Sequence, residues 1–252
     1  MSDFVSTCKT VVKLVFQRFG IQLDGRIVPN PGKAYEIITP RARYSPWNCD
    51  DEFLNVYRSI QAHTLVDLYR CYELWCLVKQ AAKLESGAIL EVGVWRGGTG
   101  VLIAKAARLS GLQVPVYLCD TFSGVVKAGK HDTYYKGGEH ADAAEDDVRC
   151  LIQSLSLPHV CLLRGVFPDE TASSLDGQSF RFCHIDVDVY QSAHDILNWL
   201  WPRLVLGGMV VYDDYGFDSC SGISKHVDEQ AGSNDRVVIH NVNGHAIVIK
   251  LR

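Results

Sequence analysis

Three aspartates stand where two strand-like segments of this chain end. Asp186 ends F-R-F-C-H-I-D, and Asp213 and Asp214 end G-G-M-V-V-Y-D-D. Carboxylates that converge at the ends of neighbouring strands repel one another unless protons or a cation intervene. Oxygen-only ligands favour Mg²⁺ or Mn²⁺ over zinc. The pattern therefore predicts a divalent metal site, with capping of the following segment as the alternative role of Asp213 and Asp214.

A glycine turn follows the strand-like segment I-L-E-V-G-V. Its spacing E-x-G-x-x-x-G-G, which includes Gly93 and Gly97, differs from the G-x-G-x-x-G of dinucleotide enzymes. Asp120 ends the next strand, 27 residues after Gly93, where a carboxylate can accept hydrogen bonds from both ribose hydroxyls. Together the two features favour a nucleotide pocket. The alternative is a turn that serves helix packing, with Asp120 as a helix cap.

Alternating strands and helices must position these residues. From Ser86-Gly87 onward, short apolar runs typical of buried parallel strands alternate with helical segments. The expected strands are I-L-E-V-G-V, V-P-V-Y-L-C-D, H-V-C-L-L-R-G, F-R-F-C-H-I-D and G-G-M-V-V-Y-D-D, and the expected helices are 99–110, 144–154, 192–200 and 223–230. Right-handed βαβ units predict an α/β fold with a doubly wound, mostly parallel sheet. The tail around Asn243-Gly244 predicts a C-terminal antiparallel hairpin.

Helical spacing also precedes the expected sheet. Apolar residues predict a helix over 5–21, followed by a connection rich in proline and glycine. An apolar face over 51–84 predicts two further helices, and its members are Leu54, Ile60, Leu65, Leu68, Tyr72 and Leu77. We therefore expect an N-terminal arm over 1–50 and one large domain over 51–252.

Composition excludes several classes of protein. The chain has 252 residues, 47% of them hydrophobic, which is enough for a sizeable core. It carries 25 Lys and Arg against 29 Asp and Glu, so it lacks the excess of positive charge that binding to nucleic-acid phosphates requires. Lys9, Lys13 and Arg18 interrupt the N-terminal apolar stretch, so we expect no secretion signal. The longest stretch without Asp, Glu, Lys or Arg, 150–163, is too short to span a bilayer, so we expect no membrane span. Nine cysteines without a C-x-x-C pair predict reduced thiols and a soluble, cytoplasmic protein.

Five ordered segments between about residues 51 and 230 resemble the macrocin O-methyltransferase family, which includes mycinamicin and novobiocin sugar O-methyltransferases. They are E-V-G-V-W-R-G-G-T, C-D-T-F-S-G, G-V-F-P-D-E, H-I-D-V-D-V-Y and G-G-M-V-V-Y-D-D-Y-G. The resemblance implies a class I, Rossmann-like methyltransferase that depends on S-adenosylmethionine and Mg²⁺ (or Mn²⁺). Its expected partner is a small-molecule hydroxyl acceptor, such as a sugar or another natural product, and assembly into a homo-oligomer is left open.

The resemblance also assigns roles to residues. It implies that Asp186, Asp213 and Asp214 bind the metal and that Asp120 binds the ribose of the cofactor. The full expected cofactor set is Thr64, Glu91, Gly93, Arg96, Gly97, Thr99, Asp120 and Ser123. Related catechol O-methyltransferases carry a lysine base three residues after the first metal aspartate. Val189 stands there in this chain, so Asp186 is the candidate to take the proton.

Several residues receive weaker assignments. The histidines His184, His194 and His240 are expected to be hydrogen-bonded structural residues. Segments such as 1–50 help to form a lid over substrate in the family, which makes Tyr35, Tyr44 and Trp47 candidate lining residues.

The expected reaction is an in-line displacement in which a hydroxyl oxygen attacks a sulfonium methyl group. A metal chelated by two neighbouring hydroxyls would lower the pKa of one of them, so we expect a vicinal diol as the acceptor. One rival is a nicotinamide-dependent oxidoreductase, but G-x-G-x-x-G and Tyr-x-x-x-Lys are both missing from the sequence. The other rival, a binding module without turnover, has no need of a costly acidic cluster.

Overall fold

The computed structural model describes residues 31–38 and 42–252. The chain divides into two units after Ile37, and the second unit is Ile38–Arg252. The expected boundary at residue 50 stays a prediction. The helix expected over 5–21 lies outside the described residues, and the lid assigned to 1–50 stays a prediction. All further elements belong to the second unit.

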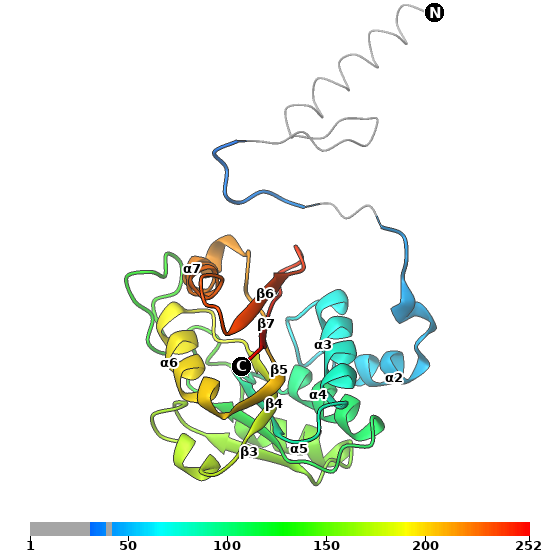
Figure 1. The fold of residues 1–252 in the computed structure, drawn as a ribbon. Coiled ribbons are helices and arrows are strands. Elements are labelled where there is room, and N and C mark those ends of the chain that lie inside the picture. Colours follow the sequence, from blue (N-terminus) through cyan, green and yellow to red (C-terminus); the bar gives the residue numbers. More distant parts are fainter. Residues whose placement is uncertain (1–30, 39–41) are drawn as a thin grey trace, which may run out of the picture. The chain divides into compact units, whose positions relative to one another are not determined.

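A seven-stranded sheet forms the centre of this unit, with strand order β3-β2-β1-β4-β5-β7-β6 (Figure 1). Neighbouring strands from β3 to β5 run parallel, whereas β7 runs antiparallel to both β5 and β6. The strands are β1 (Ala88–Val92), β2 (Val116–Asp120), β3 (Val160–Arg164), β4 (Phe180–Ile185), β5 (Leu204–Tyr212), β6 (Arg236–His240) and β7 (Ala246–Lys250). The predicted parallel sheet and C-terminal hairpin are both confirmed.

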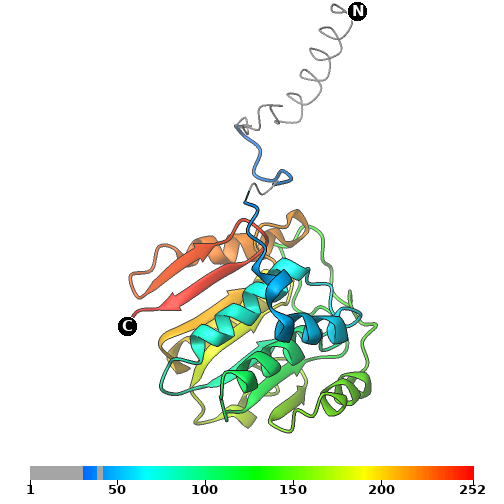
Figure 2. The same cartoon turned by 90° about the vertical axis from the view of Figure 1, so that its right-hand side faces the viewer.

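The helices cover both faces of the sheet (Figure 2). One core includes side chains of α2 to α5, and a second core, on the opposite face, includes side chains of α6 and α7. The helices are α2 (Asp51–Ile60), α3 (Leu68–Ala81), α4 (Gly98–Leu109), α5 (Glu145–Ser154), α6 (Tyr190–Leu200) and α7 (Ser221–Gln230). Short 3₁₀ helices lie at Pro46–Cys49, Ala172–Leu175, Trp201–Arg203 and Asp218–Cys220. Because parallel strands are covered on both faces, β1 and β4 are buried along their whole length.

Aspartate caps divide the segment 51–84 into two helices. Asp50 accepts from the amide of Phe53 at 2.9 Å and begins α2, and Asp67 accepts from the amide of Tyr69 at 2.8 Å and begins α3. The two expected helices are confirmed, but Leu65 lies in the connection between them and is 67% exposed, so its place on the expected apolar face was wrong. The buried side of α3 instead carries Arg70, Cys71, Leu74, Trp75, Val78 and Ala81.

Strand β5 begins three residues before the expected segment, at Leu204. Its pairing with β4 shifts register between Phe180 and Phe182. The cysteines that the structure describes are all free thiols, in agreement with the predicted reduced state. Within the described ranges, the helices are all too short or too polar to cross a membrane.

Candidate functional site

A cavity of about 270 Å³ opens where the parallel strands end, as expected for a doubly wound sheet. The predicted residues Asp186, Asp213, Asp214, Thr64, Gly93, Thr99 and Asp120 all line it. Glu91, Arg96, Gly97 and Ser123 belong to the expected cofactor set but do not line the cavity. The structure therefore gathers the carboxylates and half of the expected cofactor residues around one space.

Gly93 lets two strands approach each other closely at the floor of the cavity. Its φ of +90° lies in the left-handed region that favours glycine. A Cβ atom at this position would lie 1.7 Å from the carbonyl oxygen of Asp186. The turn after β1 and the end of β4, which carries a candidate metal ligand, can approach this closely only because residue 93 lacks a side chain.

Asp120 organises the turn that follows β1. Its Oδ2 accepts from the backbone amides of Val94 at 2.6 Å and Trp95 at 2.8 Å, and its Oδ1 accepts from the amide of Phe122 at 2.7 Å. Trp95 and Phe122 both have positive φ, of 47° and 52°. The carboxylate thus stabilises two strained turns and still lines the cavity.

The other expected cofactor residues have local structural contacts. Glu91 is fully buried, and its Oε1 lies 2.9 Å from His184 Nδ1. Arg96 pairs with Asp142 at 2.7 Å, away from the cavity wall. Gly97 caps α4 with a φ of +88°, and a Cβ there would lie 2.9 Å from a methyl group of Val148. The exposed Ser123 bonds to Thr121 only. These four residues therefore do not form part of the cavity wall.

One ligand oxygen from each of Asp186, Asp213 and Asp214 lies within 4.8 Å of the others. Burial, followed by repulsion from Asp213 and Asp214, raises the pKa of Asp186 well above its usual range. Burial, followed by repulsion from Asp188 and Asp213, does the same to the pKa of Asp214. Two of the three carboxylates are therefore poorly compensated, which is the electrostatic condition that a divalent cation would relieve.

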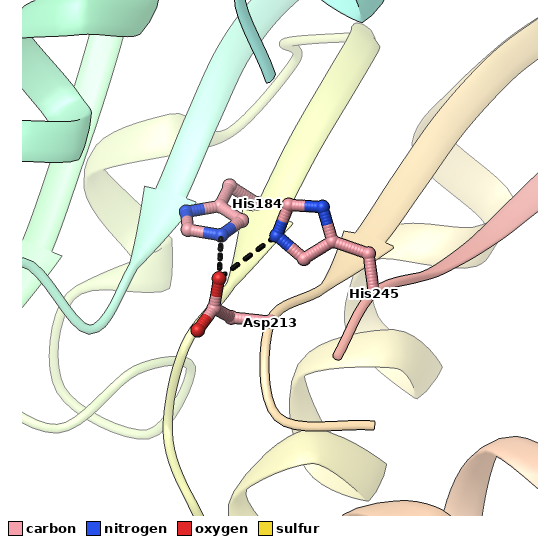
Figure 3. Close-up of side chains that lie close together, drawn as sticks. All are labelled: His184, Asp213 and His245. Carbon is pink, nitrogen blue, oxygen red and sulfur yellow. Dashed lines mark hydrogen bonds and ion pairs between the residues drawn. The ribbon is translucent and has the colours of Figure 1, made fainter. Parts of the chain in front are cut away.

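Asp213 differs from its two neighbours because its charge already has partners. Its Oδ2 forms an ion pair with Arg70, and its Oδ1 lies 2.8 Å from His245 Nε2 and 3.6 Å from His184 Nε2 (Figure 3). Burial alone would raise the pKa of Asp213, but His184, His245 and Arg70 lower it below its usual range. Asp213 is therefore held as a carboxylate.

Each histidine beside Asp213 is oriented by a glutamate on its other ring nitrogen. His184 Nδ1 lies 2.9 Å from Glu91 Oε1, and His245 Nδ1 lies 2.6 Å from Glu73 Oε2. Burial alone would lower the pKa of His184, but Asp213 and Glu91 raise it to about 10. The chain of side chains from Glu91 to Glu73 thus fixes the position of Asp213 from both sides.

Sequence reasoning missed Arg70, His245 and Glu73. Arg70 and Glu73 lie on α3, and His245 directly precedes β7, so all three are far from Asp213 in the sequence. One signal in the sequence could have indicated Arg70. It is a charged residue one turn after the cap of α3, and it lies on the same buried side of the helix as Leu74.

Asp188 lies next to the carboxylate cluster in a strained conformation, with a φ of 64°. Its amide donates to Asp214 Oδ2 at 3.2 Å, and Cys220 Sγ lies 3.8 Å from its Oδ1. Tyr135 and His140 line the same part of the cavity, with the Tyr135 hydroxyl 3.3 Å from His140 Nε2. These two residues come from the long connection between β2 and α5, where no motif indicated them.

The remaining predicted residues of the second unit do not line the cavity. His194 bonds to Asn198 at 2.8 Å, and the exposed His240 packs beside a tyrosine ring. Tyr44 is 82% exposed, and Trp47 packs edge-on against Tyr69 at 5.0 Å. Contrary to the expectation, neither residue lines the cavity. Tyr35 is exposed and belongs to the first unit.

Comparisons with known proteins identify relatives of this chain. The macrocin-O-methyltransferase (TylF) family matches residues 51–246. The 8-demethyl-8-(2,3-dimethoxy-alpha-L-rhamnosyl)-tetracenomycin-C 4'-O-methyltransferase of Streptomyces olivaceus is 32% identical over 170 residues, which cover 63% of this chain and 65% of that protein. The mycinamicin III 3''-O-methyltransferase of Micromonospora griseorubida is 27% identical over 201 residues, which cover 70% of this chain and 74% of that protein. The chain thus spans about two thirds to three quarters of the length of these relatives.

Solved structures agree with this relationship. The O-methyltransferase NovP superposes with a TM-score of 0.66 at 25% identity, covering 75% of this chain and 83% of that protein. The calicheamicin methyltransferase CalS11 has a TM-score of 0.60 at 14% identity, covering 88% of this chain and 99% of that protein, which supports the fold alone.

Proposed function

Because this chain belongs to the macrocin-O-methyltransferase family, we propose that it transfers a methyl group from S-adenosylmethionine to a hydroxyl of a natural-product sugar. The observation that carries the proposal is the meeting of a glycine turn and a carboxylate cluster in one cavity, through Gly93 and Asp186. A methyl donor and a hydroxyl acceptor must be adjacent for an in-line transfer.

The cofactor fits the part of the cavity beside β1 and β2. Gly93, Thr64 and Thr99 line the same wall of the cavity. Asp120 Oδ1 accepts one backbone hydrogen bond and keeps a second lone pair for a ribose hydroxyl. We assign Gly93, Thr64, Thr99 and Asp120 to cofactor binding.

A divalent cation fits the carboxylate cluster. Asp186, Asp213 and Asp214 offer oxygen ligands within 4.8 Å of one another, and burial and mutual repulsion leave two of them poorly compensated. Mg²⁺ and Mn²⁺ prefer such a donor set. When bound there, the cation would lower the pKa of an acceptor hydroxyl and orient it.

The protein's own groups would then direct the reaction. The acceptor oxygen forms a bond to the methyl carbon as the bond from that carbon to sulfur breaks, and the hydroxyl proton must leave. Asp186 is our candidate for the group that takes this proton, because it lines the cavity directly beside Gly93. Arg70, His245 and His184 hold Asp213 ionised throughout.

We further propose that the acceptor carries two adjacent hydroxyls. A cation with three carboxylate ligands has coordination positions left for a bidentate partner, which would orient one hydroxyl for attack. The names of two relatives describe methylation of a sugar-bearing compound and of a mycinamicin, which supports the substrate class.

Turnover with labelled S-adenosylmethionine against a panel of sugars and vicinal diols tests the function. We expect methylation of at least one diol in the presence of Mg²⁺, and loss of turnover when a chelator is in excess. The monodeoxy analogue of the accepted diol should show a lower kcat as well as weaker binding, because the lost hydroxyl orients the attacking oxygen. Micromolar NAD binding without any response to S-adenosylhomocysteine would refute the proposed cofactor. Full turnover in chelator would refute the metal.

A further inference from the structure

Arg70 brings a permanent positive charge into the carboxylate cluster from helix α3. The residue is 7% exposed, and its Nη1 forms an ion pair with Asp213 Oδ2. Its Nε bonds to Asp67 at 2.8 Å, and its guanidinium carbon lies 4.8 Å from the ring centre of Phe217. The guanidinium is therefore held by two carboxylates and an aromatic ring, and it lines the same cavity as the cluster.

This contact divides the three candidate metal ligands into two kinds. Both oxygens of Asp213 already have partners, Arg70 on Oδ2 and His245 on Oδ1. In the part of the chain that the structure describes, the ion pairs include no lysine or arginine bonded to Asp186 or Asp214. A cation entering the cavity thus meets two carboxylates without a lysine or arginine partner and one that is already paired.

We propose that Arg70 is a built-in counter-ion of the metal site, which holds Asp213 in place and weakens the binding of a divalent cation by Asp186 and Asp214. The proposal rests on the metal site put forward under the proposed function. Arg70 is a positioning residue in this scheme, since it acts through Asp213.

The charge of Arg70 should lower the affinity of the cluster for a divalent cation. An arginine remains protonated at every pH at which the protein is folded, so its charge always opposes a cation at the cluster. Like charges a few ångströms apart in a partly buried site repel strongly enough to change affinity by about tenfold or more. A purely structural Arg70 would have the opposite signature, because its loss would disorder Asp213 and weaken metal binding.

Titration of Mn²⁺ into the full cofactor-free chain, with free Mn²⁺ followed by electron paramagnetic resonance, measures the effect directly. We expect Arg70→Met to bind Mn²⁺ about tenfold more tightly than the parent. Arg70→Lys keeps the charge and should stay within about threefold of the parent. Lys79→Met removes one positive charge from the same helix without touching the cluster and should leave the affinity unchanged.

Asp214→Asn separates failure of this proposal from failure of the metal site. If the parent binds no Mn²⁺, or if Asp214→Asn binds it as well as the parent, the metal site itself is wrong and the role of Arg70 falls with it. If Asp214→Asn abolishes binding but Arg70→Met binds equally or more weakly, the metal site stands and only the counter-ion role is overturned.

Asp67→Asn provides a second test that holds even if Arg70→Met does not fold. Asparagine preserves the cap of α3 but removes the charged partner of Arg70 Nε, so the guanidinium charge acts on Asp213 alone. We expect Mn²⁺ to bind about threefold more weakly. Glu52→Gln, which removes a negative charge from the exposed side of α2, is the control and should have a smaller effect. Equal effects of the two substitutions, or tighter binding by Asp67→Asn, would overturn the proposal.

Discussion

The replacement Gly93→Ala should both destabilise the protein and disable its cavity. The new Cβ would lie 1.7 Å from the Asp186 carbonyl oxygen, whereas real Cβ atoms essentially never come closer than 3.0 Å, so β1 and β4 must separate by at least 1.3 Å at this point. That movement breaks the hydrogen bond from the Asp186 amide to the Val92 carbonyl, now 2.9 Å long. The positive φ of residue 93 adds strain, because alanine rarely adopts it.

These effects have roughly known sizes. The forced φ costs about 1 to 2 kcal/mol, the clash about 1 to 3 kcal/mol and the lost hydrogen bond about 1 kcal/mol. We therefore expect Gly93→Ala to lower the free energy of unfolding by about 4 kcal/mol, a large part of a typical total. Gly111→Ala is the matched control, since Gly111 has a φ of +81° but a Cβ there would touch nothing within 4 Å.

Urea denaturation of the parent and both variants measures the difference. Gly111→Ala should cost about 1 to 2 kcal/mol, from backbone strain alone. Calorimetry with S-adenosylhomocysteine should show binding by Gly111→Ala and none by Gly93→Ala. If the two variants unfold within about 1 kcal/mol of each other, the close approach of β1 to β4 is not what requires glycine, and our reasoning about this position fails.

Three further predictions concern single side chains. Asp120→Asn should lower the free energy of unfolding by about 1 to 3 kcal/mol and weaken S-adenosylhomocysteine binding, because one carbonyl oxygen replaces an anion that accepts from three amides. Unchanged urea denaturation and unchanged binding in calorimetry would contradict this prediction. Asp214→Asn should melt at the same or a higher temperature than the parent in chelator, since burial and neighbouring carboxylates raise the pKa of Asp214; a markedly lower melting temperature would argue against unrelieved repulsion. Burial, followed by the charge of His194, lowers the pKa of His226 to about 4 from an unfolded value near 6.5, so its stabilising effect is complete above pH 6.5 and is lost as the pH falls toward 4. The free energy of unfolding should therefore fall by about 2 kcal/mol more in the parent than in His226→Phe between pH 7 and pH 5, and equal slopes would exclude this residue.

The sequence was sufficient to predict the order and type of the main elements. Buried parallel strands such as β4 form continuous apolar runs, and helices such as α4 begin where a glycine turn ends, so their residues carry a local signal. The expected helices 99–110 and 144–154 differ from α4 and α5 by one residue at their ends. Local patterns work here because each strand is buried on both faces wherever it lies in the sheet.

The sequence also indicated the strand-end carboxylates. Parallel strands bring their carboxyl ends to one edge of the sheet, so Asp186 and Asp214 had to lie near each other once β4 and β5 were neighbours. The same argument placed Gly93 and Asp120 on the cavity wall. Glu91, which only the family resemblance assigned to the cofactor, lies within β1, is fully buried and does not line the cavity.

Only the tertiary structure decided how the charges of the site are balanced. Arg70 and His245 reach Asp213 across sequence separations of 143 and 32 residues, from a helix and a hairpin that carry no motif for the site. Ion pairing depends on the distance between charges in space and on how far water is excluded, and neither quantity is written in local spacing. The residue types therefore determined that Asp186, Asp213 and Asp214 would meet, whereas the packing of α3 and the hairpin against β5 determined that Asp213 would be the carboxylate paired with Arg70 and His245.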